Sequence, residues 1–246
     1  YDQYGRLIKE GVYQDFEHKE ALTELLRFKS TKDEGLVSLR EYVGRMRENQ
    51  KSIYYITGQN QIFLLNSPLL EMYEKKDIEV LLLDDEIDEI IITAVPKYDE
   101  KDLKSVNRSG AADDFSDETD KEAEKSLKPV LKKIKKILGE KVKDVKLSNR
   151  LSDSPSCIVA DEHDPTAQMQ ELMRSMGQAD MPQIKPILEI NPDHAIIKKL
   201  KDMTKKKSFD DISLLLYEQA LIQEGVKLED PSGFVERLNS VIVETL

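Results

Sequence analysis

The sequence predicts an α/β fold followed by an α+β fold, in one chain of 246 residues. Three observations support this: a strand–helix–strand pattern between residues 52 and 83, a polar acidic stretch after residue 105, and several amphipathic helices beyond it. We expect a three-layer, βαβ-containing first part at 1–106, a linker at 107–120, and a second part at 121–246. That second part should hold a small mixed sheet with helices and end in a dimerising helix pair.

Helical patterns open the first part. Asp15 can cap a helix that runs through about Phe28, because the apolar residues between them recur at helical spacing. Ser38 stands three residues before Glu41, which is the capping-box arrangement, so another helix should follow Ser38.

A βαβ unit is predicted next. Residues 52–57 are β-branched or aromatic apart from Ser52, which favours a strand, and Gly58 closes it. Ser67 and Pro68 supply a cap and an N1 proline for a helix to about Lys75. The apolar run within 78–83 is typical of a parallel strand that is buried on both faces. A helix at 85–94 should follow.

The stretch 105–120 is acidic and has only Phe115 as a bulky apolar residue, so we interpret it as the linker. A long amphipathic helix then ends at Leu138, where Gly139 can provide a left-handed cap. Short strands are predicted at 142–147, 157–160 and 187–190, and helices at 193–201, 209–223 and 231–243.

Composition limits the function. The chain has 37 Lys and Arg against 48 Asp and Glu, a net charge of −11, which disfavours nucleic acid as a partner. The longest apolar runs are far shorter than the ~20 residues of a membrane helix. A single cysteine, Cys157, and no signal-peptide pattern fit a reducing cytoplasm, so we expect a cytoplasmic location. The chain starts without Met on an aromatic pair, which suggests a fragment.

Several features suggest sites but have simpler explanations. The lysines between 121 and 146 fit a solvated helix face better than a nucleic-acid stripe, because no aromatics interleave with them. The acidic cluster at 84–89 fits a helix N-terminus. Cys157 lies in an apolar run, as a small buried residue does, although a thiol nucleophile with His163 is the alternative. We assign no catalytic residue, no metal and no cofactor; an enzyme domain that uses the acidic cluster or Cys157 remains the rival hypothesis.

Two apolar patterns are harder to explain as ordinary core. A methionine stripe falls on one helical face in 164–176 and has little nearby apolar sequence to cover it. It is either a covered helix or a partly exposed, adaptable binding face. The stripe consists of Met169, Leu172, Met173 and Met176.

The last two helices are apolar around more than the roughly 100° of circumference that one packing face needs. Two such hairpins can bury the excess by forming a four-helix bundle across a two-fold axis, so we expect a homodimer. Its interface residues are Ile212, Leu215, Leu216, Leu221, Phe234, Leu238, Val241 and Ile242.

Longer motifs carry a family resemblance. LLRFKST at 25–31 and YVGRMRENQKSIYYITG at 42–58 resemble the middle domain of the ninety-kilodalton heat-shock chaperones of the bacterial type. RLSDSP at 150–155, LEINPDH at 188–194 and LLYEQA at 215–220 resemble that family's C-terminal dimerisation domain. The resemblance covers nearly the whole chain.

The resemblance implies a molecular chaperone, whose full-length form is an ATP-driven dimeric clamp for partly folded client proteins. ATP and Mg²⁺ would bind in a domain outside these residues, so we expect no catalytic activity here. The client surface would comprise the methionine stripe and a middle-domain segment at Glu89, Ile90 and Thr93. Many bacterial relatives have an aromatic residue where Ile90 stands, and this chain contains no Trp. A purely structural dimerisation module without client binding is the alternative.

Overall fold

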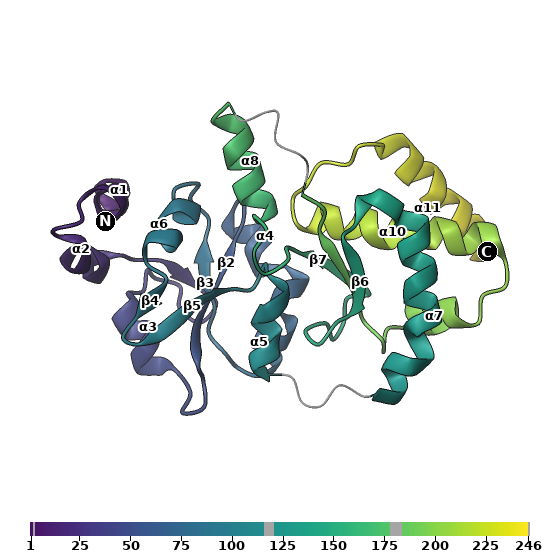
Figure 1. The fold of residues 1–246 in the computed structure, drawn as a ribbon, viewed down its shortest axis with the longest axis horizontal. Coiled ribbons are helices and arrows are strands. Elements are labelled where there is room, and N and C mark those ends of the chain that lie inside the picture. The colour runs from purple at the N-terminus through teal and green to yellow at the C-terminus, as the bar shows by residue number, and fades with distance from the viewer. Residues whose placement is uncertain (2, 116–120, 178–183, 246) are drawn as a thin grey trace. The chain divides into compact units, whose positions relative to one another are not determined.

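The chain forms a mixed α/β structure with two small mixed sheets in a computed structural model, which describes residues 1, 3–115, 121–177 and 184–245 (Figure 1). Its contacts divide it into two compact units. Unit 1 comprises Tyr1–Asn66, Tyr73–Asn107 and Gln168–Met181, and unit 2 comprises Ser67–Met72, Arg108–Ala167 and Pro182–Leu246. No helix in the described ranges is both long and apolar enough to cross a membrane.

Unit 1 is built around a five-stranded sheet of order β1-β3-β2-β5-β4. β2 pairs in parallel with both β3 and β5, and the edge strands β1 and β4 pair antiparallel with β3 and β5. The strands are β1 Lys29–Ser30, β2 Ser52–Thr57, β3 Leu81–Leu83, β4 Lys97–Tyr98 and β5 Lys101–Ser105. The helices of this part of the chain are α1 Gly5–Gln14, α2 Lys19–Leu25, α3 Leu39–Arg45, α4 Gln61–Leu65, α5 Glu71–Lys75 and α6 Asp88–Ala94.

β2 is buried along its whole length. Ile53 and Tyr55 join a core cluster with residues of α3 and α6. Tyr54, whose side chain points to the opposite side of the strand, packs against Tyr73 of α5 with ring centroids 5.0 Å apart. The parallel pairing of β2 with β3 confirms the predicted βαβ unit.

Some predicted boundaries in unit 1 are wrong by a few residues. The helix expected to start at Asp15 is α2, Lys19–Leu25, and it ends before Phe28 because Phe28 exchanges backbone hydrogen bonds with Val37. The strand expected from residue 78 has ladder pairing only from Leu81. The helix expected from residue 85 begins at Asp88.

Unit 2 holds a three-stranded sheet of order β6-β8-β7, in which β8 is parallel to β6 and antiparallel to β7. Its strands are β6 Asp144–Leu147, β7 Ser156–Val159 and β8 Ile187–Ile190. The α-helices of this unit are α7 Lys121–Leu138, α9 Ala195–Lys201, α10 Lys206–Gln223 and α11 Pro231–Thr245. Helix α8, Ala167–Ser175, falls almost wholly in the segment of unit 1 that starts at Gln168. Short 3-10 helices occupy Pro68–Leu70, Ser109–Phe115 and Gly139–Lys141.

The core of unit 2 lies between α7, α9, α10 and the sheet. Ile134 and Leu138 of α7 are buried there, and Gly139 ends the helix with a φ of +53°, as predicted. In the predicted linker, Ala111 and Ala112 are buried, whereas residues 116–120 lie outside the described part of the chain.

Candidate interaction surfaces

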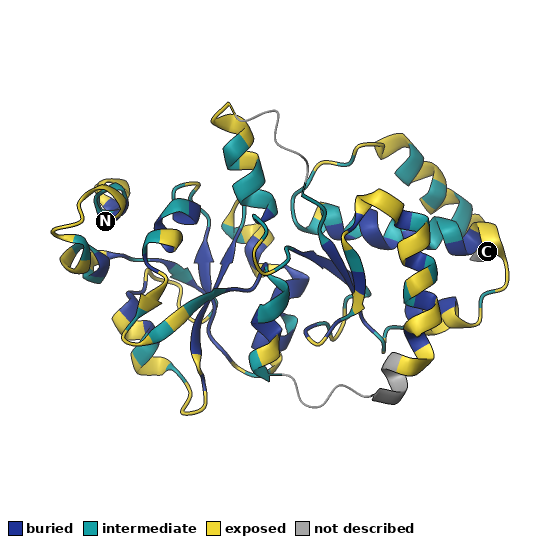
Figure 2. Cartoon of the chain, in the orientation of Figure 1, coloured by how far each residue is buried: buried dark blue, intermediate teal, exposed yellow. Residues whose placement is uncertain are grey.

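Helix α8 carries the predicted methionine stripe, and its apolar side is incompletely covered. Met169, Leu172 and Met173 are partly buried, Met176 is 68% exposed, and none of the helix residues is fully buried. Figure 2 shows α8 in the colours of intermediate and exposed residues along its length. The helix ends at Ser175, and Gly177 follows in the next turn with a φ of +90°, which suits glycine. The stripe is therefore an apolar surface that water reaches.

The second predicted client patch lies on α6 and is more covered than the stripe. Glu89 is 8% exposed, Ile90 is partly buried and Thr93 is exposed. The Thr93 hydroxyl donates a hydrogen bond to the Ile90 carbonyl oxygen at 2.6 Å, so it is engaged with its own helix. Of the three side chains, Ile90 and Thr93 offer most of the accessible surface.

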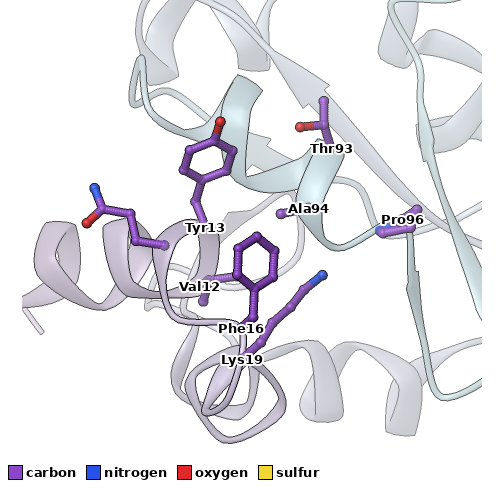
Figure 3. Close-up of a pocket in the computed structure, with 8 residues that line it drawn as sticks. Val12, Tyr13, Phe16, Lys19, Thr93, Ala94 and Pro96 are labelled. Carbon is purple, nitrogen blue, oxygen red and sulfur yellow. The ribbon is translucent and has the colours of Figure 1, made fainter.

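A shallow pocket of about 600 Å³ opens beside Thr93. Phe16, in the turn after α1, is 84% exposed at this pocket, and Tyr13 is 53% exposed. Figure 3 shows these aromatic side chains on one side and the residues at the end of α6 on the other. The sequence analysis missed this pocket because it assigned no helix to residues 5–14. The pocket is lined by Val12, Tyr13, Gln14, Phe16, Lys19, Thr93, Ala94 and Pro96.

Helices α10 and α11 form a packed pair with a partly uncovered apolar surface. Arg237 of α11 donates hydrogen bonds to both carboxylate oxygens of Glu218 on α10, and Ser208 donates one to Glu244 at 2.7 Å. The first contact lies among half-buried side chains, so it fixes the two helices to each other.

The predicted interface residues do not all lie on the same side of this pair. Leu216 is 1% exposed and belongs to the core of unit 2. Leu238 and Ile242 are 39% and 45% exposed, whereas the other predicted interface residues, Ile212, Leu215, Leu221, Phe234 and Val241, are partly buried. Val235 and Val243 are exposed as well, and only the structure identifies them as part of this surface.

A buried ion pair organises the strand region of unit 2. The Arg150 side chain is 0% exposed, and its Nε lies 3.0 Å from Oε2 of Glu189 on β8. The guanidinium also donates to the carbonyl oxygens of Arg108 and Ser109, and the Ser148 hydroxyl donates to Glu189 at 2.9 Å. This network holds the segment of unit 2 that begins at Arg108 to the middle strand of its sheet.

Cys157 lies beside this network and is buried, as the sequence predicts. Its Sγ is 3.9 Å from Glu189 Oε2. Burial raises the pKa of the Cys157 thiol well above its ordinary value, and the Glu189 charge raises it further. A thiol held protonated in this way is a poor nucleophile, so this geometry gives no support to the rival hypothesis of thiol catalysis.

The acidic cluster at 84–89 is matched by lysines. Asp84 pairs with Lys29 at 2.7 Å, and Lys9 lies 2.6 Å from Asp88 and 3.5 Å from Asp85. Within the described ranges, no group of three or more His, Cys, Asp and Glu residues is placed to hold a metal ion. Within unit 1, acids of this cluster therefore form ion pairs with the lysine side chains of Lys9 and Lys29.

Comparisons with known proteins identify the family of this chain. The family model described as Hsp90 protein matches residues 1–246. The chain belongs to the Hsp90 family. Among Hsp90-family relatives, the chaperone protein HtpG of Treponema denticola is 50% identical over 248 residues, covering 98% of this chain. The HtpG proteins of Legionella pneumophila and Wolinella succinogenes are each 45% identical, over 100% and 98% of this chain.

The chain spans about 39–40% of the length of these Hsp90-family relatives. The family membership confirms the resemblance inferred from the motifs. It supports a role as a chaperone.

Proposed function

We propose that this chain is the dimerising, client-binding part of an HtpG-type chaperone. The incompletely covered apolar stripe carries the proposal, because three partly buried apolar residues on one face of α8, together with the exposed Met176 just after it, offer surface to other polypeptides. The two units would correspond to the end of a middle domain and a C-terminal dimerisation domain, and the protein would work in the cytoplasm.

The chemistry of the stripe suits clients of varied sequence. Methionine is unbranched and polarisable, so Met169, Met173 and Met176 can adapt to different apolar segments. Binding of this kind is reversible and needs no covalent step. In the full-length protein, ATP and Mg²⁺ bound outside these residues would drive the clamp that captures and releases clients.

The first test is suppression of client aggregation by the whole 246-residue chain. Replacing Met173 and Met176 with Ser removes half of the stripe at partly and fully exposed positions. We expect the variant to require several-fold more chaperone for half-maximal suppression, as measured by light scattering of a thermally unfolding client. A melting temperature within a few degrees of the parent chain is expected, because exposed substitutions change stability little.

A matched control removes two exposed apolar side chains elsewhere, by Leu25→Ser and Leu36→Ser, at 49% and 42% exposure. This control should suppress aggregation as well as the parent chain. Equal activity of the Met variant would contradict client binding by α8. A parent chain that dimerises yet never suppresses aggregation would favour the alternative, a structural dimerisation module.

A further inference from the structure

Lysines are concentrated in two segments of an otherwise acidic chain. Residues 125–138 and 195–207 contain twelve lysines and a single acid, Asp202, which gives a net charge of +11. The whole chain carries −11, so all remaining residues together carry −22. We call these twelve side chains the lysine face: Lys125, Lys128, Lys132, Lys133, Lys135, Lys136, Lys198, Lys199, Lys201, Lys205, Lys206 and Lys207.

The structure brings the two segments together in unit 2. α7 packs against both α9 and α10. The Lys133 ammonium lies 3.5 Å from the ring centroid of Phe209, which joins the middle of α7 to the first turn of α10. Ile197 and Leu200 of α9 share the core cluster with Ile134 of α7. Figure 2 shows exposed residues along α7 on the side turned to the viewer.

Most of these lysines face solvent, and two of them form ion pairs in the described part of the chain. All of the lysines except Lys133 are exposed. In the described part of the chain, the ion pairs of this face are Lys135 with Asp144 at 2.7 Å and Lys198 with Asp193 at 3.2 Å. Such a collection of like charges creates a positive potential that attracts anionic partners and reduces the stability of the isolated protein.

Spacing along α7 indicates which kind of anion fits. Lys125, Lys128, Lys132 and Lys136 are three or four residues apart, so they form one row with about 5–6 Å between neighbours. In an extended peptide, alternate side chains point the same way about 6.6–6.8 Å apart. Carboxylates on every second residue of such a peptide can therefore follow the row.

We propose that the lysine face binds acidic, extended polypeptide segments of other proteins. The face contains no arginine, the residue that best grips phosphate through two parallel hydrogen bonds. It also lacks an exposed aromatic side chain for base stacking, because Phe209 is only 2% exposed. In the described parts of both segments, Ile196 is the only exposed large apolar residue, which is too little for insertion into a lipid surface.

Fluorescence anisotropy of the whole chain with a labelled acidic peptide tests this proposal. The probe is an unstructured 16-residue peptide of alternating Glu and Ser, and its neutral counterpart has Gln in place of Glu. We expect saturable binding of the acidic peptide alone, weakened about tenfold when the salt concentration rises from about 50 to 250 mM, because salt screens exposed charges.

The decisive variant is Lys128→Gln with Lys132→Gln and Lys136→Gln, which should weaken binding about tenfold. Its matched control, Lys51→Gln with Lys75→Gln and Lys227→Gln, removes the same charge from exposed lysines elsewhere and should change binding less than twofold. Thermal melts of both variants check that the fold is intact. Equal losses in the two variants would overturn the proposal, since binding would then reflect net charge alone.

Three competing ligands complete the test. Single-stranded DNA of the same charge, vesicles containing phosphatidylserine, and a second copy of the chain are each titrated against the peptide complex. Tighter binding of DNA or vesicles through the same lysines would overturn the assignment to polypeptides. Self-association that the α7 variant abolishes would assign the face to a second copy instead. Because Met173 and Met176 are untouched, failure here is distinguishable from failure of client binding by α8.

Discussion

Lys9 and Asp88 form a buried ion pair in unit 1, in which each residue changes the pKa of the other. Both residues are largely buried in unit 1, and Nζ lies 2.6 Å from Oδ1. Burial raises the pKa of Asp88 from 3.8 to about 6, outweighing the opposite pull of Lys9. The Asp88 charge in turn raises the pKa of Lys9, although burial opposes this. The pair is therefore necessary because each charge would be costly alone.

A pH dependence of stability follows from the raised pKa of Asp88. The folded state holds the Asp88 proton more tightly than the unfolded state, so this contribution is fully present below pH 3.8 and is lost as the pH rises through about 6. We expect Asp88→Asn to be less stable overall, because Lys9 loses this partner, but to lack the decline in stability that the titration of Asp88 gives the parent chain between about pH 4 and pH 6. Urea unfolding at a series of pH values measures it.

The control for this experiment is Glu86→Gln, an exposed acid of the same cluster. Its free energy of unfolding should follow that of the parent chain across the series. Parallel curves for Asp88→Asn and the parent chain would contradict the pH dependence assigned to Asp88.

At the scale of elements, local signals in the sequence were sufficient wherever a few adjacent residues decide the structure. The capping box at Ser38 and Glu41 forms with both of its hydrogen bonds, and β2 and β8 have the predicted bounds. Strands β1 and β4 have two residues each and exist only because a neighbouring strand pairs with them. No local pattern encodes such pairing, so the sequence analysis missed them.

The loop before β7 is held in place by Glu71, a residue from a distant part of the sequence. Within unit 2, its carboxylate accepts hydrogen bonds from the backbone N–H groups of Ser152, Asp153 and Ser154. The Asn191 side chain donates to the carbonyl oxygens of Ser152 and Ser154 in the same loop. Glu71 therefore binds the backbone N–H groups of this loop, and Asn191 binds its carbonyl oxygens.

Replacing Glu71 with Gln should loosen this loop, because one of the two acceptor oxygens becomes an NH₂ group that faces backbone donors. We expect a loss of about 1–2 kcal/mol in the free energy of unfolding and faster proteolysis at residues 151–155. Glu74→Gln changes an exposed carboxylate on the same helix and should do neither. Unchanged protection of the loop in Glu71→Gln would contradict its role.

At the scale of the whole molecule, the proposed dimer would use apolar surface that one chain leaves uncovered. Val235, Leu238 and Ile242 are 51%, 39% and 45% exposed, and their spacing puts them on one face of α11. A stable homodimer buries roughly 2,000 Å² or more. We expect light scattering over a dilution series to give the mass of a dimer.

The variant Val235→Ser, Leu238→Ser and Ile242→Ser should shift this mass to that of a folded monomer. Leu7→Ser, Leu25→Ser and Leu36→Ser remove three exposed apolar side chains from unit 1 and should leave the dimer intact. A folded monomer of the parent chain at micromolar concentration would refute the assembly.

The candidate surfaces were only partly predictable from the sequence. Apolar periodicity identified the stripe on α8 and the last two helices, but it could not separate Leu216, which packs inward, from Leu238, which is exposed. The lysine face was visible as a run on one helix only, because the second half of it lies about sixty residues further along the chain. Which segments share a surface depends on tertiary packing.

The buried pair of Arg150 and Glu189 has a consequence for how this protein can change over generations. Loss of either partner alone leaves the other charge buried without its counter-charge, at a cost of roughly 3–5 kcal/mol, which is a large fraction of the roughly 5–15 kcal/mol that stabilises a typical domain. Single substitutions that remove either charge should therefore be selected against, whereas paired substitutions that replace both charges carry a much smaller cost. We therefore expect the two positions to be inherited as a unit among lineages of this family.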